Sequence, residues 1–442
     1  MKKIYYRIPM LMAAALTAVT CYIEKPFPDD EELMGEQLPA WQTGYLDIHH
    51  ISTGRGNCTF MILPDGTTMM VDAGDLGPGD DYKREIMSRV PYTSRTPGEW
   101  IVRYVKHFLE EAGLPGEQLD YMLVTHFHND HIGTPSSYSL PSNNGKYLMT
   151  GVSHVGNFLD IENFVDRGYP DYDFPYPGVM DNVMLDNYMA FLEDDANRIK
   201  TRSAFEVGAS DQFVLRKAPQ DYPTFMIRNI YCNGTIWTGV DKTTEFLVPE
   251  GVEQNILSDE NLWSAVINVN YGDFDYHCGG DILGGYGDWR NVETRVGKII
   301  GETDVLNCNH HAYKDAMNAD IVSSTRSQAY VIPVWDCYHP EEAPLARMLG
   351  SSESEKMVFA AGMVDGYFDG DVPMDFWKLL ALYICSNTLS SLPWAISFGE
   401  GEIQVMRNQA AQVLWWYDDM KNAVPAWYKS IYERAHSTHT YM

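Results

Sequence analysis

Positive charge is scarce in this sequence. The 442 residues include 32 Lys and Arg against 61 Asp and Glu, which gives a formal net charge of −29 at pH 7. No long basic run offsets this excess, so a nucleic-acid backbone would be repelled over most of the surface. We therefore expect no nucleic-acid partner, although the same acidity can also serve solubility alone.

Cysteine is also sparse. The seven cysteines lie far apart in the chain, which excludes the dense disulfide framework of a small secreted domain. With 45% hydrophobic residues, the chain can bury a sizeable core instead. We expect most of the cysteines to lie there as small apolar residues.

Beyond the N-terminus, the sequence has no apolar run long enough to span a bilayer. At the N-terminus, Lys2, Lys3 and Arg7 are followed by a short apolar run over residues 8–19. This order predicts an export signal over residues 1–21. Cys21, which follows the run, resembles the acceptor site of a bacterial lipoprotein.

Acylation of Cys21 would anchor the chain to a membrane, since more than one acyl chain gives stable attachment. The resemblance thus implies a bacterial periplasmic or outer-membrane lipoprotein. The alternative is cleavage near Ala15, which would release a soluble periplasmic protein.

The stretch from Tyr121 to Gly133 carries the strongest chemical signal. An apolar strand, Met122 to Thr125, is followed by a cluster of metal-ligand side chains at His126, His128, Asp130 and His131. Residues two apart on an extended chain point the same way, so the first two imidazoles can reach one ion while the last two side chains reach a neighbouring point. This spacing predicts two metal ions. The mixture of imidazole and carboxylate favours zinc, with iron or manganese as alternatives.

This His-x-His-x-Asp-His pattern resembles the metal-binding signature of the metallo-β-lactamase superfamily. The resemblance implies an α/β fold, a four-layer αββα sandwich with a dinuclear metal site at one edge. Val71-Asp72-Ala73-Gly74 is similar to an early strand end of the family, where Asp72 would brace the metal loop through hydrogen bonds.

The segment from Asn261 and Ser264 to Gly280-Asp281 resembles one subgroup of the superfamily, found in competence-type DNA-uptake proteins and phosphorylcholine esterases. In that subgroup the aspartate, here Asp281, bridges the two metals. The His310-His311-Ala312 turn is similar to the family's last ligand turn, with alanine in place of glycine. Its flanking residues favour His311 as the ligand, with His310 as the alternative.

The third histidine ligand of the first metal site is missing from its usual place. The family often supplies it from a Gly-His-Thr-like turn before the bridging aspartate, and no such turn stands here. His154 is the one histidine between His131 and His277 and is the remaining candidate. We expect His154 to be an ordinary strand residue rather than a metal ligand.

The resemblance implies hydrolysis, because two close metals can bind a bridging hydroxide that acts as nucleophile. Asp130 and Asp281 are then the catalytic carboxylates. The subgroup favours a phosphoester substrate, either a small molecule or part of the cell surface. Two alternatives stay open: a lactonase or β-lactamase-type hydrolase, and a non-catalytic surface lipoprotein that binds a glycan or partner. The sequence names no general acid, although Tyr313 is near enough in the chain to be considered.

The chain is therefore expected to be organised around one large catalytic unit. We predict the following segments: a signal at 1–21, a tether at 22–43, the metallo-β-lactamase-like domain at 44–420 with an insertion at about 136–250, and a C-terminal tail at 421–442.

One prediction follows from the N-terminal pattern. Cys21→Ser should move the protein from membrane to soluble fractions of its native host, because the acyl acceptor is lost. Immunoblots of the separated fractions measure this change. Continued membrane attachment of the variant would rule out the lipid anchor.

Overall fold

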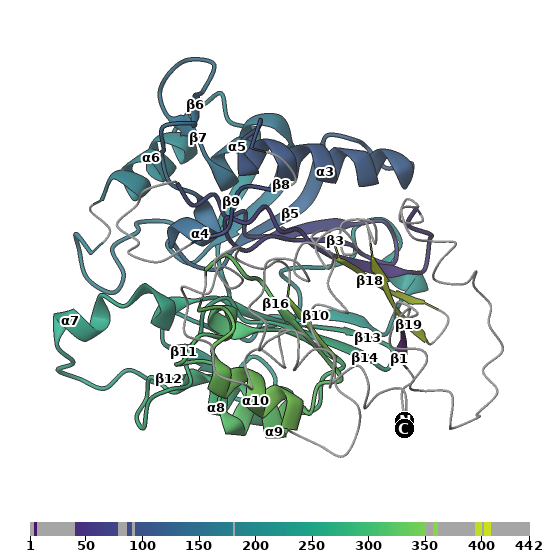
Figure 1. Ribbon diagram of the computed structural model, residues 1–442, viewed down its shortest axis with the longest axis vertical. Coiled ribbons are helices and arrows are strands. Elements are labelled where there is room, and N and C mark those ends of the chain that lie inside the picture. The colour runs from purple at the N-terminus through teal and green to yellow at the C-terminus, as the bar shows by residue number, and fades with distance from the viewer. Residues whose placement is uncertain are drawn as a thin grey trace, which may run out of the picture.

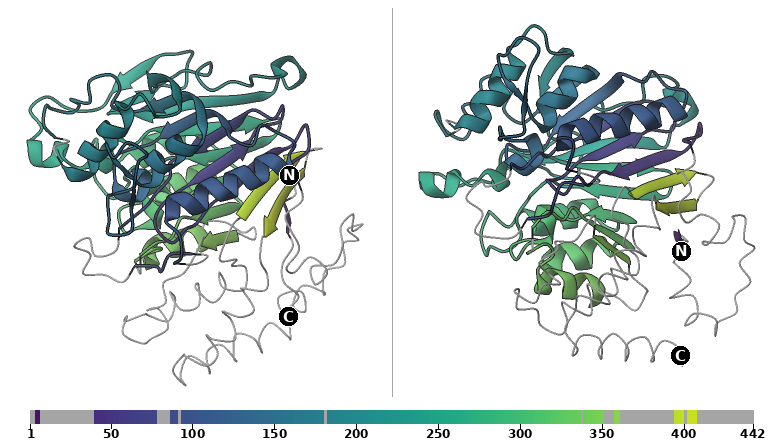
Figure 2. Two further views of the ribbon diagram at one scale, coloured as in Figure 1. Left: turned by 90° about the horizontal axis from the view of Figure 1, so that it is seen from above. Right: turned by 45° about the horizontal axis from the view of Figure 1, so that its top comes forward.

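The computed structural model describes residues 4–6, 40–77, 86–90, 93–179, 182–336, 338–350, 357–360, 394–399 and 402–407. Two mixed β-sheets lie face to face, and helices cover the outer face of each sheet (Figure 1). Figure 2 shows the same layers from two further directions, with the blue helix α3 (Pro97–Glu111) on one side and the green helices on the other. The predicted α/β four-layer sandwich is confirmed.

The first sheet has nine strands among the described residues, and its two halves differ in direction. Strands β2 to β4 form an antiparallel meander, whereas β4, β5, β8 and β9 run parallel. In spatial order the strands are β1 (Ile4–Tyr6), β19 (Glu402–Arg407), β18 (Trp394–Gly399), β2 (Leu46–His50), β3 (Thr59–Ile62), β4 (Thr68–Val71), β5 (Gln118–Val124), β8 (Asp160–Asp166) and β9 (Ile199–Ala204).

The second sheet repeats this plan with eight described strands. Its β10 to β14 portion is antiparallel, and β14 to β17 run parallel. In spatial order the strands are β12 (Thr244–Phe246), β11 (Thr235–Trp237), β10 (Phe225–Cys232), β13 (Val266–Tyr271), β14 (Phe274–Cys278), β15 (Val305–Asn307), β16 (Ala329–Ile332) and β17 (Met357–Ala360). A small hairpin of β6 (Leu140–Pro141) and β7 (Leu148–Met149) stands apart from both sheets.

Helices cover the outer faces because their apolar stripes match the sheets. In α3, Thr96 caps the first turn by accepting a hydrogen bond from the Glu99 amide, and Pro97 begins the helix. The remaining described helices are α4 (Asn129–Ile132), α5 (Gly151–Phe158), α6 (Val183–Leu192), α7 (Gln254–Leu257), α8 (Val292–Ile300), α9 (Ala319–Thr325) and α10 (Glu342–Gly350), with 3-10 turns η1 (Pro219–Asp221), η2 (Glu260–Trp263) and η3 (Asn309–Ala312).

The core lies in layers between these elements. One cluster fills the space between the sheets, and includes Leu46, Met61, Ile267 and Val305. A second lies between the first sheet and helices α3, α5 and α6, and a third packs α8 against the second sheet. Because both faces of each sheet are covered, most strand residues are buried on both sides.

This double coverage corrects one expectation. His49 and His50 are adjacent on β2, which predicts one buried and one exposed side chain. Both are buried, and burial lowers the pKa of each to about 3. The strand has no solvent-facing side, because helix α3 covers one face and the second sheet covers the other.

A second correction concerns residues 189–202, for which the sequence predicts one helix. The helix α6 ends at Leu192, and β9 begins at Ile199. The Asn197 side chain donates to the carbonyl oxygens of Phe191 and Leu192, which closes the helix end and turns the chain into the strand.

The described cysteines and helices bear on the sparse cysteine content and on the lack of long apolar runs. Four cysteines, Cys58, Cys232, Cys278 and Cys308, are buried as free thiols, as predicted, and the other three lie outside the described residues. In the part of the chain that the structure describes, no helix combines the length and apolar character that crossing a membrane requires. The proposed lipid acceptor Cys21 lies outside the described residues.

Candidate metal centre

The first group of candidate ligands lies at the ends of two neighbouring parallel strands. Val71 of β4 pairs with Leu123 of β5, so the two strands end at the same edge of the first sheet. Asp72 follows the first strand, and the loop that begins at His126 follows the second. The parallel pairing therefore places the whole His-x-His-x-Asp-His loop beside Asp72.

The second sheet supplies ligands in the same way. Cys278 of β14 pairs in parallel with Asn307 of β15, so the loops that carry Asp281 and His311 begin at one edge. One contact joins this edge to the first sheet, and a second holds Asp281 within its own half. The Ala265 amide donates to the Thr125 carbonyl at 2.8 Å, and the Asp281 amide donates to the hydroxyl of Ser264 at 3.1 Å.

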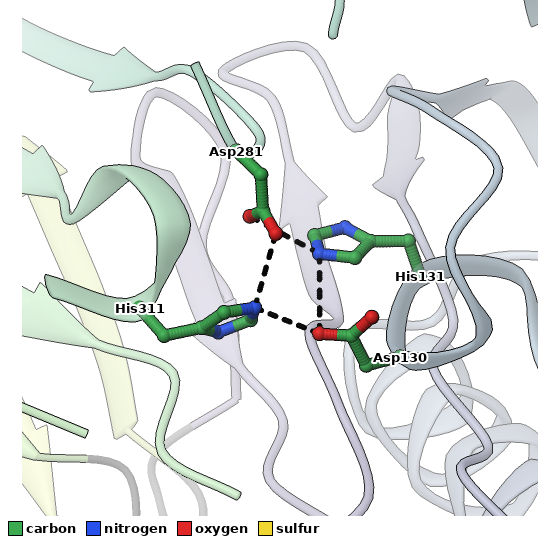
Figure 3. Close-up of side chains that lie close together, drawn as sticks. All are labelled: Asp130, His131, Asp281 and His311. Atoms are coloured by element: carbon green, nitrogen blue, oxygen red, sulfur yellow. Dashed lines mark ion pairs between the residues drawn. The ribbon is translucent and has the colours of Figure 1, made fainter. Parts of the chain in front are cut away.

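Four buried side chains, two from each half, converge at this junction: Asp130, His131, Asp281 and His311 (Figure 3). One ligand atom from each lies within 4.8 Å of the other three. His311 Nε2 is 2.8 Å from Asp130 Oδ2 and 3.4 Å from Asp281 Oδ2. His131 Nε2 is 3.2 Å from Asp281 Oδ1.

A second group lies next to the first and shares one member with it. His126, His128 and Asp281 bring one ligand atom each within 4.8 Å of one another. His126 Nε2 lies 3.2 Å from His128 Nδ1 and 3.6 Å from Asp281 Oδ2. Asp281 therefore belongs to both groups, which is the position a bridging carboxylate requires. His128 is half-buried, so this group lies nearer to solvent.

The imidazoles are oriented by hydrogen bonds at their other nitrogens. His131 Nδ1 donates to Asp72 Oδ2 at 2.7 Å, and His311 Nδ1 donates to the Pro333 carbonyl at 2.7 Å. Since both acceptors lack a proton to give, Nδ1 carries the hydrogen in each ring. The Nε2 atoms then face the carboxylates, which is the usual arrangement of histidine ligands.

The charges of this cluster depend on one another. Burial alone would lower the pKa of His311, but the carboxylates of Asp281 and Asp130 raise it to about 9. Burial would likewise raise the pKa of Asp130, yet His131 and His311 hold it well below its usual range. The two buried carboxylates therefore require positive charge beside them, which protons supply when no cation is bound.

This donor set fits a pair of divalent ions. Imidazole nitrogens and carboxylate oxygens converge, the rings of His131 and His311 present their second nitrogen to the centre, and one carboxylate is shared. The deeper group has four donors and the outer group has three, so the outer group is incomplete for a closed tetrahedral site.

Asp72 supports the loop as the sequence predicts. Its Oδ1 accepts from the Thr125 amide at 2.8 Å, and its Oδ2 accepts from the Thr125 hydroxyl and from His131. Asn57 adds a fourth donor at 3.2 Å. One buried carboxylate thus fixes both the start and the end of the ligand loop, and Asp72 itself has a φ of 58°.

The turn that carries His311 is strained. Three consecutive residues, His310, His311 and Ala312, have φ values of 42°, 53° and 56°. Residues with a Cβ atom rarely occupy this left-handed region, and each costs about 1 kcal/mol there. Ala312 stands where the family resemblance leads one to expect glycine, and its position explains why glycine suits that place.

An ion pair that the sequence did not predict holds the other side of the ligand loop. Glu260 of η2 accepts a hydrogen bond from the Phe127 amide at 2.8 Å, between the two histidines of the outer group. The Arg167 Nε donates to the same carboxylate oxygen at 2.6 Å, and its guanidinium lies 4.6 Å from the centre of the Phe127 ring. The partners are more than ninety residues apart in sequence, so no local pattern could have indicated this pair.

The remaining histidine candidates lie outside the two groups. His154 lies on α5, not on a strand, and stacks on Phe158 beside Gly98. Burial lowers its pKa to about 4. His310 Nδ1 contacts Asp315 Oδ1 at 2.7 Å, and its Nε2 contacts Asn261. The structure thus brings His311, not His310 or His154, into the cluster.

Two aromatic residues flank the cluster. His339 stacks on His311 with ring centres 4.7 Å apart and an interplanar angle of 17°. Tyr313, considered above as a general acid, packs against the rings of His310 and His339. His339 therefore contacts a ring of the cluster directly, although the sequence leaves open whether it lines the site or only belongs to a turn before a helix.

Comparisons with known proteins support the same family. The model of the metallo-β-lactamase superfamily matches residues 51–134, which contain Asp72 and the ligand loop. The match shows that this part of the chain is similar to the metallo-β-lactamase superfamily. A search among curated proteins finds no match.

Solved structures of similar fold are distant in sequence. The metallo-β-lactamase fold protein YhfI from Bacillus subtilis is 12% identical with a TM-score of 0.36, over 71% of this chain and 96% of that one. The diiron β-hydroxylase CmlA from Streptomyces venezuelae is 10% identical with a TM-score of 0.37, over 72% and 53%. The short form of human tRNase Z is 10% identical with a TM-score of 0.31, over 64% and 91%. At such low scores, none of these structures bears on the reaction of this chain.

The shared carboxylate gives a prediction about metal content. Asp281→Ala should lower the bound metal to about one equivalent or less, because both groups lose a donor. Elemental analysis of protein purified without added chelator measures this. His154→Gln is the matched control, since this histidine lies outside both groups, and its metal content should equal that of the wild type. Unchanged stoichiometry in Asp281→Ala would remove the bridging assignment.

The buried ion pair gives a prediction about stability. Arg167→Met should lower the free energy of unfolding by about 3 kcal/mol, because the largely covered Glu260 loses its charged partner and keeps the Phe127 amide as a donor. The double variant Arg167→Met/Glu260→Met should lose less, since the unpaired charge is gone. Urea denaturation measures both.

The control for this experiment is Lys242→Ala, which breaks an exposed pair with Asp211 and should not change stability measurably. If Arg167→Met were no less stable than this control, the ion pair would not support the ligand loop.

Proposed function

We propose that the protein is an exported, metal-dependent hydrolase that acts on a phosphoester, either a small molecule or a component of the cell surface. The observation that carries the proposal is the sharing of Asp281 between two adjacent ligand groups, which suits two neighbouring ions. Divalent ions in such a pair supply Lewis-acid polarisation of the substrate and lower the pKa of a coordinated water.

The residues of the chain would perform distinct tasks in this reaction. Asp130, His131, Asp281 and His311 would hold the inner ion, and His126, His128 and Asp281 the outer one. Zinc suits this donor set, and manganese or iron are alternatives. Since the outer group has three donors and His128 is half-buried, the outer position is where a substrate oxygen can approach.

Support for a phosphoester comes from the chain's resemblance to the subgroup of competence-type DNA-uptake proteins and phosphorylcholine esterases. The segment that carries it, from Asn261 to Asp281, reaches the site: the Ser264 hydroxyl accepts from the Asp281 amide. The net charge of −29 disfavours a polyanion, so a compact ester is proposed rather than a nucleic acid. Export and membrane attachment through Cys21 are proposed on the N-terminal sequence alone.

Phosphoester hydrolysis should depend on the ligands of the outer group, His126, His128 and Asp281. The metal-replete protein should hydrolyse bis-p-nitrophenyl phosphate or p-nitrophenylphosphorylcholine. The absorbance of the released p-nitrophenolate measures the rate. His128→Ala should fall to near the background rate, because a ligand of the outer ion is lost. His107→Ala is the control, since this histidine is exposed on α3, and it should retain full activity.

Three other results would change the proposal. Faster cleavage of single-stranded DNA than of either ester would contradict the charge argument. Opening of lactones or β-lactams without ester cleavage would assign a different substrate to the same site. Full metal content with no hydrolysis of any of these classes would favour a surface lipoprotein that binds a glycan or partner.

A further inference from the structure

A buried arginine beside the metal-ligand loop has two donor atoms that no described residue accepts from. Arg55 lies in the loop between β2 and β3 and is 7% exposed. Its Nε and Nη1 atoms are buried and make no hydrogen bond to any residue that the structure describes. Burying a cation with unused donors costs free energy, so such a group is rarely kept without a ligand.

A second arginine adds to the positive charge at this place. The guanidinium of Arg89 lies 4.2 Å from the centre of the Tyr138 ring, and its Nη1 donates to the Arg95 carbonyl at 2.9 Å. Burial lowers the pKa of Arg55, and Arg89 lowers it further by repulsion. Two neighbouring guanidinium groups create a local site for an anion in an otherwise acidic protein.

The nearby carboxylate of Asp75 already accepts hydrogen bonds from other residues. Asp75 raises the pKa of Arg55 from nearby, but its oxygens accept from the Gly151 amide and from the Tyr138 hydroxyl, each at 3.2 Å. Burial raises the pKa of Asp75 itself to about 6. It therefore balances the arginine charges only in part and leaves the Arg55 donors unused.

This arginine lies next to the metal-ligand loop. A Cβ atom on the following residue, Gly56, would lie 2.1 Å from the Asp130 carbonyl oxygen, so the two backbones are in direct contact. The Asn57 amide donates to the same oxygen at 2.8 Å, and the Leu76 amide donates to the Arg55 carbonyl at 3.0 Å. The arginine loop thus packs on the backbone of a candidate ligand.

From these observations we infer that Arg55, assisted by Arg89, forms an oxyanion-binding subsite beside the metal centre. It would bind one compact phosphate-, sulfate- or carboxylate-type group. Resting on the proposed function, the inference adds that the substrate carries such an anionic group in addition to the ester that is cleaved. A single desolvated guanidinium can attract one such group, whereas the net negative surface still repels a polyanion.

The direct test is sulfate binding to the full-length, metal-loaded protein, measured by isothermal titration calorimetry. Sulfate should bind the wild type, and Arg55→Met should weaken binding by about tenfold or more, because charge-assisted hydrogen bonds are lost. Arg103→Met is the matched control, since this arginine is exposed on α3 and should bind sulfate as the wild type does.

Further variants distinguish sulfate binding at Arg55 from sulfate binding at the metals, and loss of the subsite from loss of the fold. His128→Ala should still bind sulfate if the anion lies at Arg55. Arg55→Lys keeps the charge, and Arg89→Met leaves Arg55 in place. Each should weaken sulfate binding, but less than Arg55→Met does. These two variants test the inference if Arg55→Met does not fold. Equal binding by wild type and Arg55→Met, or loss in His128→Ala with retention in Arg55→Met, would overturn the inference.

A kinetic experiment distinguishes this inference from the proposed function. Sulfate should raise the KM for a phosphoester that carries a second anionic group without changing kcat, and it should not do so in Arg55→Met. Absence of any esterase activity would remove the proposed function, while the calorimetry would still decide the oxyanion subsite. Ester cleavage without sulfate binding would remove the subsite alone.

Discussion

Two buried carboxylates from opposite halves of the molecule determine how the rest of the site is built. Asp130 and Asp281 both lie beside His311, and neither is exposed enough for water to compensate its charge. Positive charge must therefore be present between them. The fold supplies it through imidazoles, and a divalent cation would supply it more completely.

The two halves reach this point by the same structural device. In each sheet a pair of parallel strands ends at the junction, and the loops after those strands carry the ligands. Asp72 and Glu260 then hold the first ligand loop from its two sides, one from within its own sheet and one from the other half. Such supporting contacts keep the ligand side chains in place when no ion holds them.

The sequence predicted the local parts of this arrangement and missed the contacts between distant segments. The ligand loop after β5, the bracing role of Asp72 and the preference for His311 follow from short motifs. The Arg167–Glu260 pair does not, because its partners come from different halves and neither lies in a recognisable pattern. The helix predicted over residues 189–202 ends at Leu192 instead, because the Asn197 side chain closes its last turn through contacts that a short pattern does not indicate. His154 was a candidate by elimination, and its packing on α5 could be learned only from the fold.

The separation of the ligands along the chain also bears on when a metal can be acquired. Four donors meet only after the segment that contains His126 to His131 has packed against the segment that contains Asp281 and His311. Before this packing the first set stands apart from the second and cannot enclose an ion from both sides. The compartment in which the chain folds would thus determine which metal is bound. The supply of ions in that compartment, rather than the donor set by itself, would then decide between zinc, manganese and iron.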